Sequence, residues 1–215
     1  MHSEIVLYAI IAINVLFSWK GFEDPSFFRT YEFHMGSILS GDQKRMISSG
    51  FLHADIAHLA FNMLALYSFG EVILQTFDTL FFLTTYFASL LLGNLLTVYF
   101  HKNNYSYRAV GASGAVTGIL YSAILMYPHM QISLFFIPIG IPAYIFGFIY
   151  LLYSIYGMKS QHDNIGHTAH IGGAVAGFVF TLFQVPSLFY THTFIVVILL
   201  IPILLLFLLA QKGKI

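Results

Sequence analysis

Residues 111–128 read GASGAVTGILYSAILMYP, and this short apolar run decides how the rest of the chain is interpreted. The part between Ser113 and Pro128 would form a helix of about 22 Å at 1.5 Å per residue. Because the hydrocarbon core of a bilayer is roughly 30 Å thick, one end of this helix should lie below the membrane surface. Gly111 and Gly114 flank Ser113 and suit a tight turn into the helix. We therefore expect Ser113 to lie in a recess.

Six further apolar segments surround this run, and the connections between them are mostly short. Of the 215 residues, 58% are hydrophobic and only 8% are charged, and the mean hydropathy is +0.80. We expect no strands, because an open sheet edge is not stable in lipid and the segments are too long for barrel strands. The sequence predicts an all-α, polytopic membrane helical bundle. The predicted spans are 4–19, 53–74, 79–100, 113–127, 131–156, 168–185 and 191–210.

Charge and composition exclude several other classes of protein. Nine Lys and Arg balance nine Asp and Glu, so nothing indicates binding to nucleic acid. The chain has no cysteine, which excludes disulfides, thiolate catalysis and sulfur-ligated metal sites. Residues 5–17 lack the basic region and cleavage site of a signal peptide, so we expect a retained first span. The longest connection, 20–52, mixes charged and aromatic residues and should be a structured, partly embedded loop.

Polar residues within the predicted spans are the candidates for chemistry, because they are costly in lipid. His58 and Asn62 are four residues apart and share a helix face. His170 is followed by glycines three and seven residues later, a pattern that lets another helix approach closely. Together with Ser113, these residues supply the nucleophile, base and hydrogen-bond donors that acyl transfer requires.

Each of these residues also has a structural interpretation when it is taken alone. A serine in a membrane helix usually bonds the carbonyl four residues earlier, and a histidine beside glycines is often a packing residue. His58 and Asn62 could form a polar contact between helices. The combination favours catalysis more strongly than any single member does.

Three motifs follow one another along the chain: RMISSGFLHADIAHLAFNMLALYSFG at 45–70, GASG at 111–114 and AHIGGAVAG at 169–177. In their order and spacing they resemble the rhomboid family of intramembrane serine proteases. The resemblance runs from the first predicted span through the sixth. It implies a rhomboid core of six transmembrane helices over residues 1–185, followed by an extra C-terminal transmembrane helix and short tail over 186–215.

The resemblance also implies an activity and roles for individual residues. Rhomboids are serine endopeptidases that cleave transmembrane helices of membrane proteins through an acyl-enzyme, without a metal or other cofactor. Ser113 would be the nucleophile and His170 its base, forming a Ser-His dyad. Asn62, His58 and the Ser113 backbone amide would stabilise the oxyanion. Structural support would come from His53, Gly111, Gly114, Gly173 and Gly177.

Two positions depart from the family pattern. The family often has an aromatic residue four positions after the nucleophile, stacked on the catalytic histidine, and here that position is Thr117. A second departure lies in the first loop, where the family usually has Trp-Arg and this chain has Lys44-Arg45. The sequence therefore does not show how the ring of His170 is held.

Other functions stay open from the sequence alone. A catalytically silent rhomboid relative would bind membrane helices without cutting them, although both Ser113 and His170 are present. A small transporter could use the histidines as a proton path or metal site. A metalloprotease is disfavoured because no His-Glu-x-x-His occurs, and His53 and His58 would lie about 140° apart on one helix.

The predicted partners are the lipid bilayer and single-pass transmembrane substrates, and the predicted location is the plasma membrane.

Two indications of the membrane orientation conflict. If all seven segments cross, every Lys and Arg shares a side with Ser113, and the positive-inside rule makes that side cytoplasmic. The family usually opens its site to the extracytoplasmic side. We give the resemblance more weight, because we expect the long first loop to be partly embedded and because the rule is statistical.

Overall fold

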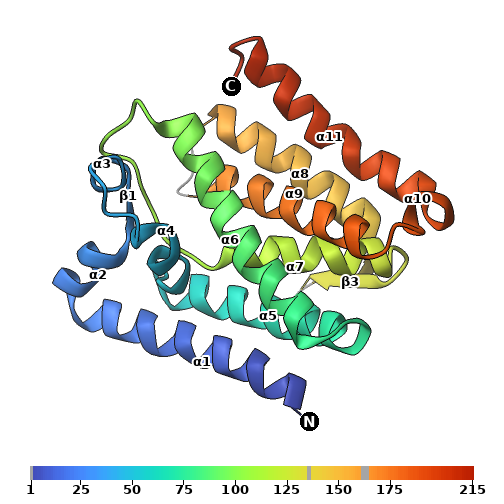
Figure 1. The fold of residues 1–215 in the computed structure, drawn as a ribbon, viewed down its shortest axis with the longest axis horizontal. Coiled ribbons are helices and arrows are strands. Elements are labelled where there is room, and N and C mark those ends of the chain that lie inside the picture. Colours follow the sequence, from blue (N-terminus) through green and yellow to red (C-terminus); the bar gives the residue numbers. More distant parts are fainter. Residues whose placement is uncertain (1, 135–136, 161–164) are drawn as a thin grey trace.

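The computed structural model describes residues 2–134, 137–160 and 165–215, and these form a helical bundle (Figure 1). Seven longer helices account for most of it: α1 (His2–Glu23), α5 (Ile56–Thr76), α6 (Thr79–His101), α7 (Ser113–Met126), α8 (Ala143–Ser160), α9 (His167–Gln184) and α11 (Thr193–Gln211). Among the described residues, α1, α5, α6 and α11 are long and apolar enough to cross a membrane. The predicted all-α membrane bundle is confirmed.

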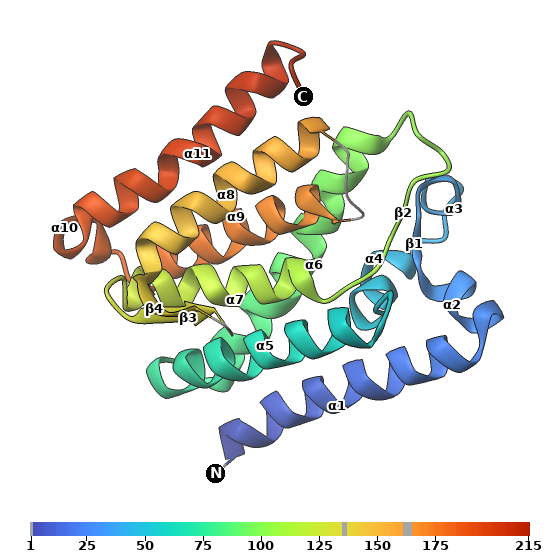
Figure 2. The same ribbon diagram turned by 180° about the vertical axis from the view of Figure 1, so that it is seen from behind.

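The arrangement of the helices puts α9 at the centre. Helix α9 packs against both α6 and α7, whereas α1 packs on α5 and α11 packs on α8. Figure 2 shows α7 in front of α6, with α1 and α11 at opposite edges of the bundle. Helix α7 has 14 residues and is therefore about 21 Å long, close to the short span predicted from the sequence.

Aspartate side chains cap the N-termini of several helices. The side chains of Asp55 and Asp78 accept hydrogen bonds of 2.7 Å from the backbone amides of His58 and Phe81, at the starts of α5 and α6. Such N-caps satisfy amides that have no partner within the helix. Asp24 caps the short helix α2 (Pro25–Tyr31) in the same way.

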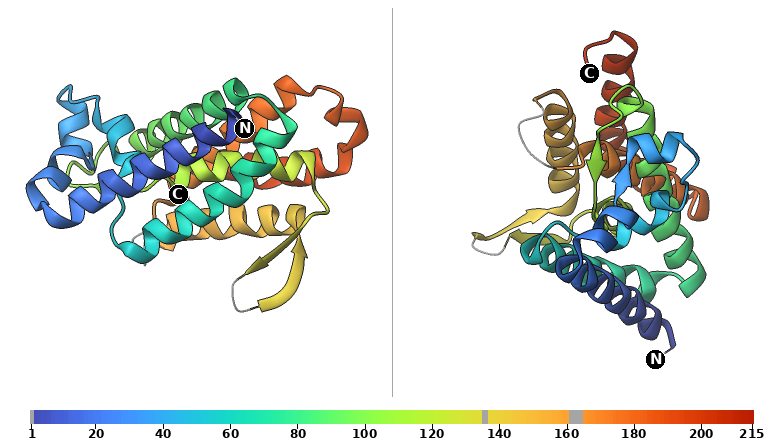
Figure 3. Two further views of the ribbon diagram at one scale, coloured as in Figure 1. Left: turned by 90° about the horizontal axis from the view of Figure 1, so that it is seen from below. Right: turned by 90° about the vertical axis from the view of Figure 1, so that its left-hand side faces the viewer.

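The prediction for 131–156 was wrong in its first part. This stretch begins with a hairpin of β3 (Gln131–Leu134) and β4 (Ile137–Pro142), which pairs Ile132 with Ile141, and α8 starts only at Ala143. Two prolines at 138 and 142 remove backbone donors and exclude a continuous helix. Figure 3 shows the hairpin projecting away from the helices.

The expectation of no strands was therefore also wrong. A second antiparallel pair joins β1 (Phe33–His34) to β2 (Arg108–Ala109). Both pairs lie in connections between the long helices, where the argument from lipid-exposed edges does not apply. The predicted start of the second span at 53 was also early, because α5 begins at Ile56.

The first connection is structured, as predicted. It contains α2, α3 (Met35–Leu39), α4 (Arg45–Ser48) and the 3₁₀ turn η1 (Ser49–Phe51). Arg45 donates hydrogen bonds of 2.8 and 2.9 Å to the backbone oxygens of Arg29 and Glu32. The buried carboxylate of Glu32 in turn pairs with Arg108 on β2. The loop is thus bound to the segment that leads into α7. A further short helix, α10 (Leu188–Thr191), precedes α11.

Candidate active site

Ser113 is the first residue of α7, and the turn before it is fixed from outside the helix. Gly111 has a φ of +131°, a conformation that other residues rarely adopt. A side chain there would also come within 2.8 Å of the His58 ring. The amide of Gly111 donates to the Ser49 oxygen at 3.0 Å. The sequence expectation of a glycine turn before Ser113 agrees with this geometry.

His170 lies on α9 and faces Ser113. Its Nε2 atom is 2.7 Å from the Ser113 Oγ atom, and the residue is only 8% exposed. The two residues are 57 positions apart in the sequence, so the contact depends on how closely α7 and α9 pack.

Glycines allow this close packing. A methyl group on Gly173 would overlap the carbonyl oxygen of Gly114, and one on Gly177 would overlap that of Gly118. Gly114 itself faces the backbone of Ala169, with 3.2 Å from a built Cβ to the Ala169 oxygen. The backbones of α7 and α9 are therefore in direct contact beside the Ser113 and His170 side chains, as the glycine spacing predicted.

His53 precedes α5 and supports the turn before Ser113. Its Nε2 atom is 3.3 Å from the amide of Ala112, which can only donate. The ring proton therefore lies on Nδ1 and is donated to the Ser18 hydroxyl at 2.9 Å. Ser18 donates in turn to the Phe51 oxygen at 2.9 Å. This chain links α1, η1 and the turn through a neutral imidazole.

His58 and Asn62 line the same groove as Ser113 and His170. The amide of Ala54 faces the His58 Nδ1 atom at 3.5 Å, which favours a proton on Nε2. That atom and the Ser113 Oγ atom both lie near the position that a Gly111 side chain would occupy, at 2.9 and 3.6 Å. The Asn62 side chain donates to the His58 backbone oxygen at 3.0 Å.

One argument made from the sequence was wrong here. His53 and His58 were placed on one helix about 140° apart, but their rings have centroids only 5.0 Å apart because His53 precedes α5. Nevertheless, the described residues contain no group of three or more His, Cys, Asp or Glu side chains that could hold a metal ion.

The groove has a volume of about 860 Å³ and lies between α5, α7, α8 and the β3–β4 hairpin. Its wall is largely apolar away from Ser113 and His170. The side chains from the helices include Phe61, Phe69, Val116, Leu120, Phe146 and Tyr150. A groove of this volume and lining suits a mainly apolar ligand beside the hydroxyl of Ser113.

Sequence reasoning missed Tyr150. Its hydroxyl is 2.9 Å from the His170 Nδ1 atom, and the two rings are stacked with centroids 5.7 Å apart. The same hydroxyl is 3.3 Å from the Thr117 Oγ1 atom. No local pattern in the sequence marks Tyr150, because it is one of several tyrosines on α8 and the contact is tertiary.

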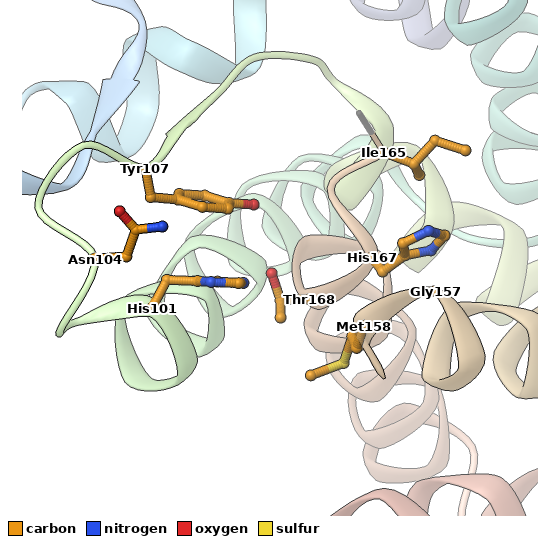
Figure 4. Close-up of a pocket in the computed structure, with 8 residues that line it drawn as sticks. All are labelled: His101, Asn104, Tyr107, Gly157, Met158, Ile165, His167 and Thr168. Carbon is orange, nitrogen blue, oxygen red and sulfur yellow. The ribbon is translucent and has the colours of Figure 1, made fainter. Parts of the chain in front are cut away.

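A second, smaller pocket of about 120 Å³ is lined by His167 and by residues that include His101 and Tyr107 (Figure 4). The His101 and Tyr107 rings stack at its edge, with centroids 4.0 Å apart. Neither Ser113 nor His170 lines this pocket.

In this membrane bundle, the Ser113 hydroxyl is hydrogen-bonded to the buried imidazole of His170 beside an apolar groove. The fold and the site therefore indicate a membrane protein whose serine can act as a nucleophile. The sequence matches the family model described as Rhomboid domain over residues 40–187. The chain belongs to the rhomboid family and is an integral, multi-pass membrane protein.

Relatives of known name support the same family. The chain is 30% identical to the RHOMBOID-like protein 12, mitochondrial, of Arabidopsis thaliana, over 80% of this chain and 55% of the relative. It is 27% identical to the Rhomboid protein 1, mitochondrial, of Saccharomyces cerevisiae, over 83% and 53%. It is 33% identical to the Rhomboid protease GluP of Bacillus subtilis, over 66% and 26%. The chain thus spans about half the length of the first two relatives.

Burial, together with the nearby His58, lowers the pKa of His53 from 6.5 to about 3. Below pH 6.5 the unfolded chain binds a proton that the folded chain excludes, so stability falls as the pH falls toward 3. We expect the free energy of unfolding in detergent to drop by about 2 kcal/mol more between pH 6.5 and 5 in the wild type than in His53→Gln.

Thermal unfolding at several pH values measures this difference, with the exposed His129→Gln as a matched control. An equal loss of stability in the wild type and in His53→Gln would contradict a neutral, buried His53.

Proposed function

We propose that this protein is an intramembrane serine endopeptidase that cleaves transmembrane helices of other membrane proteins. The observation that carries the proposal is the 2.7 Å contact between the Ser113 Oγ and His170 Nε2 atoms at the wall of the apolar groove. A silent relative that only binds helices has no need of a hydroxyl paired with an imidazole at this point. The Bacillus subtilis relative is named a protease, which supports the same activity.

In the first step, Ser113 Oγ attacks the carbonyl carbon of the scissile peptide. His170 Nε2 accepts the hydroxyl proton, because an imidazole has a pKa suited to this exchange at neutral pH. When the C–N bond breaks, the imidazolium gives that proton to the leaving amine. A water molecule, activated by the same nitrogen, then hydrolyses the Ser113 ester and frees the enzyme.

Negative charge on the peptide oxygen requires nearby donors. The amides of Gly111 and Ala112 are already bonded to Ser49 and His53, so Ser113 supplies the first amide of the turn that a ligand can use. Val116 is the first residue whose amide bonds back to the turn, to Ala112 at 2.9 Å. The His58 Nε2–H and the Asn62 side-chain amide are the further donors in this proposal.

The substrates would be single-pass transmembrane proteins that enter the groove from the lipid. A peptide bond inside an intact helix has its carbonyl bonded within that helix. The segment to be cut must therefore unwind, which small or helix-breaking residues favour. The chain would act without a metal or other cofactor, because Ser113 and water are the nucleophiles, His170 makes the proton transfers and the amide groups donate to the oxyanion.

We propose the plasma membrane as the location, with the site opening to the extracytoplasmic side. Two of the three relatives reported above are named as mitochondrial proteins, and these names do not support a plasma-membrane location. Successive long helices alternate in direction, so the start of α7 and the end of α11 share one end of the bundle.

Replacing either member of the dyad should abolish cleavage. We expect Ser113→Ala and His170→Ala, purified in detergent, to fold but to cut a model transmembrane substrate at least about 1,000-fold more slowly, because the nucleophile or its base is lost. A fluorophosphonate probe should label wild-type Ser113 and should not label His170→Ala. The exposed Ser187→Ala and His129→Ala are matched controls. Full activity in either dyad variant would refute the proposal.

Removing an oxyanion donor should slow turnover without weakening binding. We expect Asn62→Ala to lower kcat by about 100- to 1,000-fold and to leave KM nearly unchanged, because the donor acts mainly in the transition state. Steady-state kinetics on the same substrate measure both constants, with Asn104→Ala on an exposed loop as control. A kcat equal to that of the control would remove Asn62 from the oxyanion site.

Fusions placed after Ile215 test the orientation. In an extracytoplasmic arrangement, alkaline phosphatase fused there is active and green fluorescent protein is dark, since the end of α11 lies with the site. The reverse result would mean that the Lys and Arg distribution sets the topology and that the groove opens to the cytoplasm.

A further inference from the structure

The way His170 is held can be followed from its second ring nitrogen. Nε2 faces Ser113, and Nδ1 faces the hydroxyl of Tyr150 on α8 at 2.9 Å. The two rings lie nearly parallel, at 23°, so Tyr150 contacts His170 both through its ring and through its hydroxyl. A rotation of the imidazole would break both contacts.

The directions of the hydrogen bonds are fixed once His170 acts as a base. Nε2 must then be unprotonated, so Nδ1 carries the proton and donates it to the Tyr150 oxygen. The Tyr150 hydroxyl donates to the Thr117 hydroxyl at 3.3 Å. Thr117 donates to the Ser113 backbone oxygen at 2.7 Å. The chain of donors thus starts at the Ser113 hydroxyl and returns to the carbonyl of the same residue.

Tyr150 is itself held by the packing of α8. The Tyr121 hydroxyl on α7 donates to the backbone oxygen of Gly147, one turn before Tyr150. Gly147 is buried against Ile124 and Leu199, so α8 approaches α7 closely at this level. The Phe146 ring stacks on Tyr150 with centroids 5.9 Å apart. The phenol therefore has a fixed position relative to α7.

Thr117 has a role that its small side chain allows. The side chain is 3% exposed and lies one helical turn after Ser113. The Tyr150 ring, which stacks on His170, comes from α8, and the Thr117 hydroxyl contacts the Tyr150 hydroxyl.

We propose that Tyr150 is a positioning residue that selects the Nδ1–H tautomer of His170 and, together with Thr117, aligns Nε2 with Ser113. This inference rests on the proposed function and extends it. The proton taken from Ser113 stays on Nε2, while the Nδ1 proton is held by a neutral acceptor throughout the reaction. Tyr150 exchanges no proton with the substrate.

The first test uses the wild-type protein and needs no activity. Nitrogen-15 spectra of histidine-labelled protein in detergent, with His170 assigned by comparison with His170→Ala, report which ring nitrogen carries the proton. We expect Nδ1 to be protonated and Nε2 to be bare at neutral pH. A proton on Nε2 would overturn the proposal, whatever the protease assay shows.

The second test uses Tyr150→Phe, which keeps the ring and removes the hydroxyl. We expect kcat and the rate of fluorophosphonate labelling of Ser113 to fall roughly tenfold or more, with KM changed less than about twofold, because one hydrogen bond to the base is lost. The nitrogen-15 spectrum should show a mixture of tautomers. Thr117→Val should lower kcat by a smaller factor. The double variant should lower kcat by less than the product of the two single factors, because both side chains act through one hydrogen-bonded chain.

The matched control is Tyr156→Phe, the same change at a residue of α8 that is 66% exposed. A Tyr150→Phe variant with the control's kcat and an unchanged tautomer would overturn the proposal. If Ser113→Ala kept full activity, the proposed function would fail, but the tautomer measurement would still decide the role of Tyr150.

Discussion

Direct contact between the backbones of α7 and α9 is the constraint on which the rest of the structure depends. Lipid offers little hydrophobic drive for two helices to associate, so packing and hydrogen bonds must hold them. The facing glycine pairs, 114 with 173 and 118 with 177, let main-chain atoms touch. Only at that separation can a serine side chain, which is one atom long beyond Cβ, reach an imidazole on the neighbouring helix.

The first connection fixes the other end of the arrangement. Helix α7 begins at Ser113 without a side-chain N-cap, so its first turn depends on contacts from outside. The Ala112 amide donates to the His53 ring, and the Gly111 amide donates to the Ser49 backbone oxygen. Glu32, directly before β1, pairs with Arg108 on β2, which leads into this turn. Arg45 is tied to the same loop through backbone oxygens, which gives this residue a structural role beside the site.

The sequence predicted some of these features well because they depend on local chemistry. Glycines around Ser113 and after His170, and the short apolar run before Pro128, indicate a turn, a close contact and a short helix without any knowledge of the fold. The hairpin at 131–142 was missed, because its alternating isoleucines and prolines were read as part of a long apolar span. Tyr150 could not be identified, since only the packing of α8 on α7 and α9 shows which of its tyrosines meets His170.

The contact between Tyr150 and His170 also bears on the cost of placing such a pair inside a membrane. In water-soluble serine hydrolases a buried aspartate usually orients the histidine. Moving an ionised carboxylate from water into a medium of low dielectric constant costs several kcal/mol even after relaxation. A phenol and an alcohol carry no net charge, so the hydrogen-bonded ring through Tyr150 and Thr117 orients the imidazole without that Born penalty. Tyr150 and Thr117 therefore add no charge of their own beside His170 in the resting site.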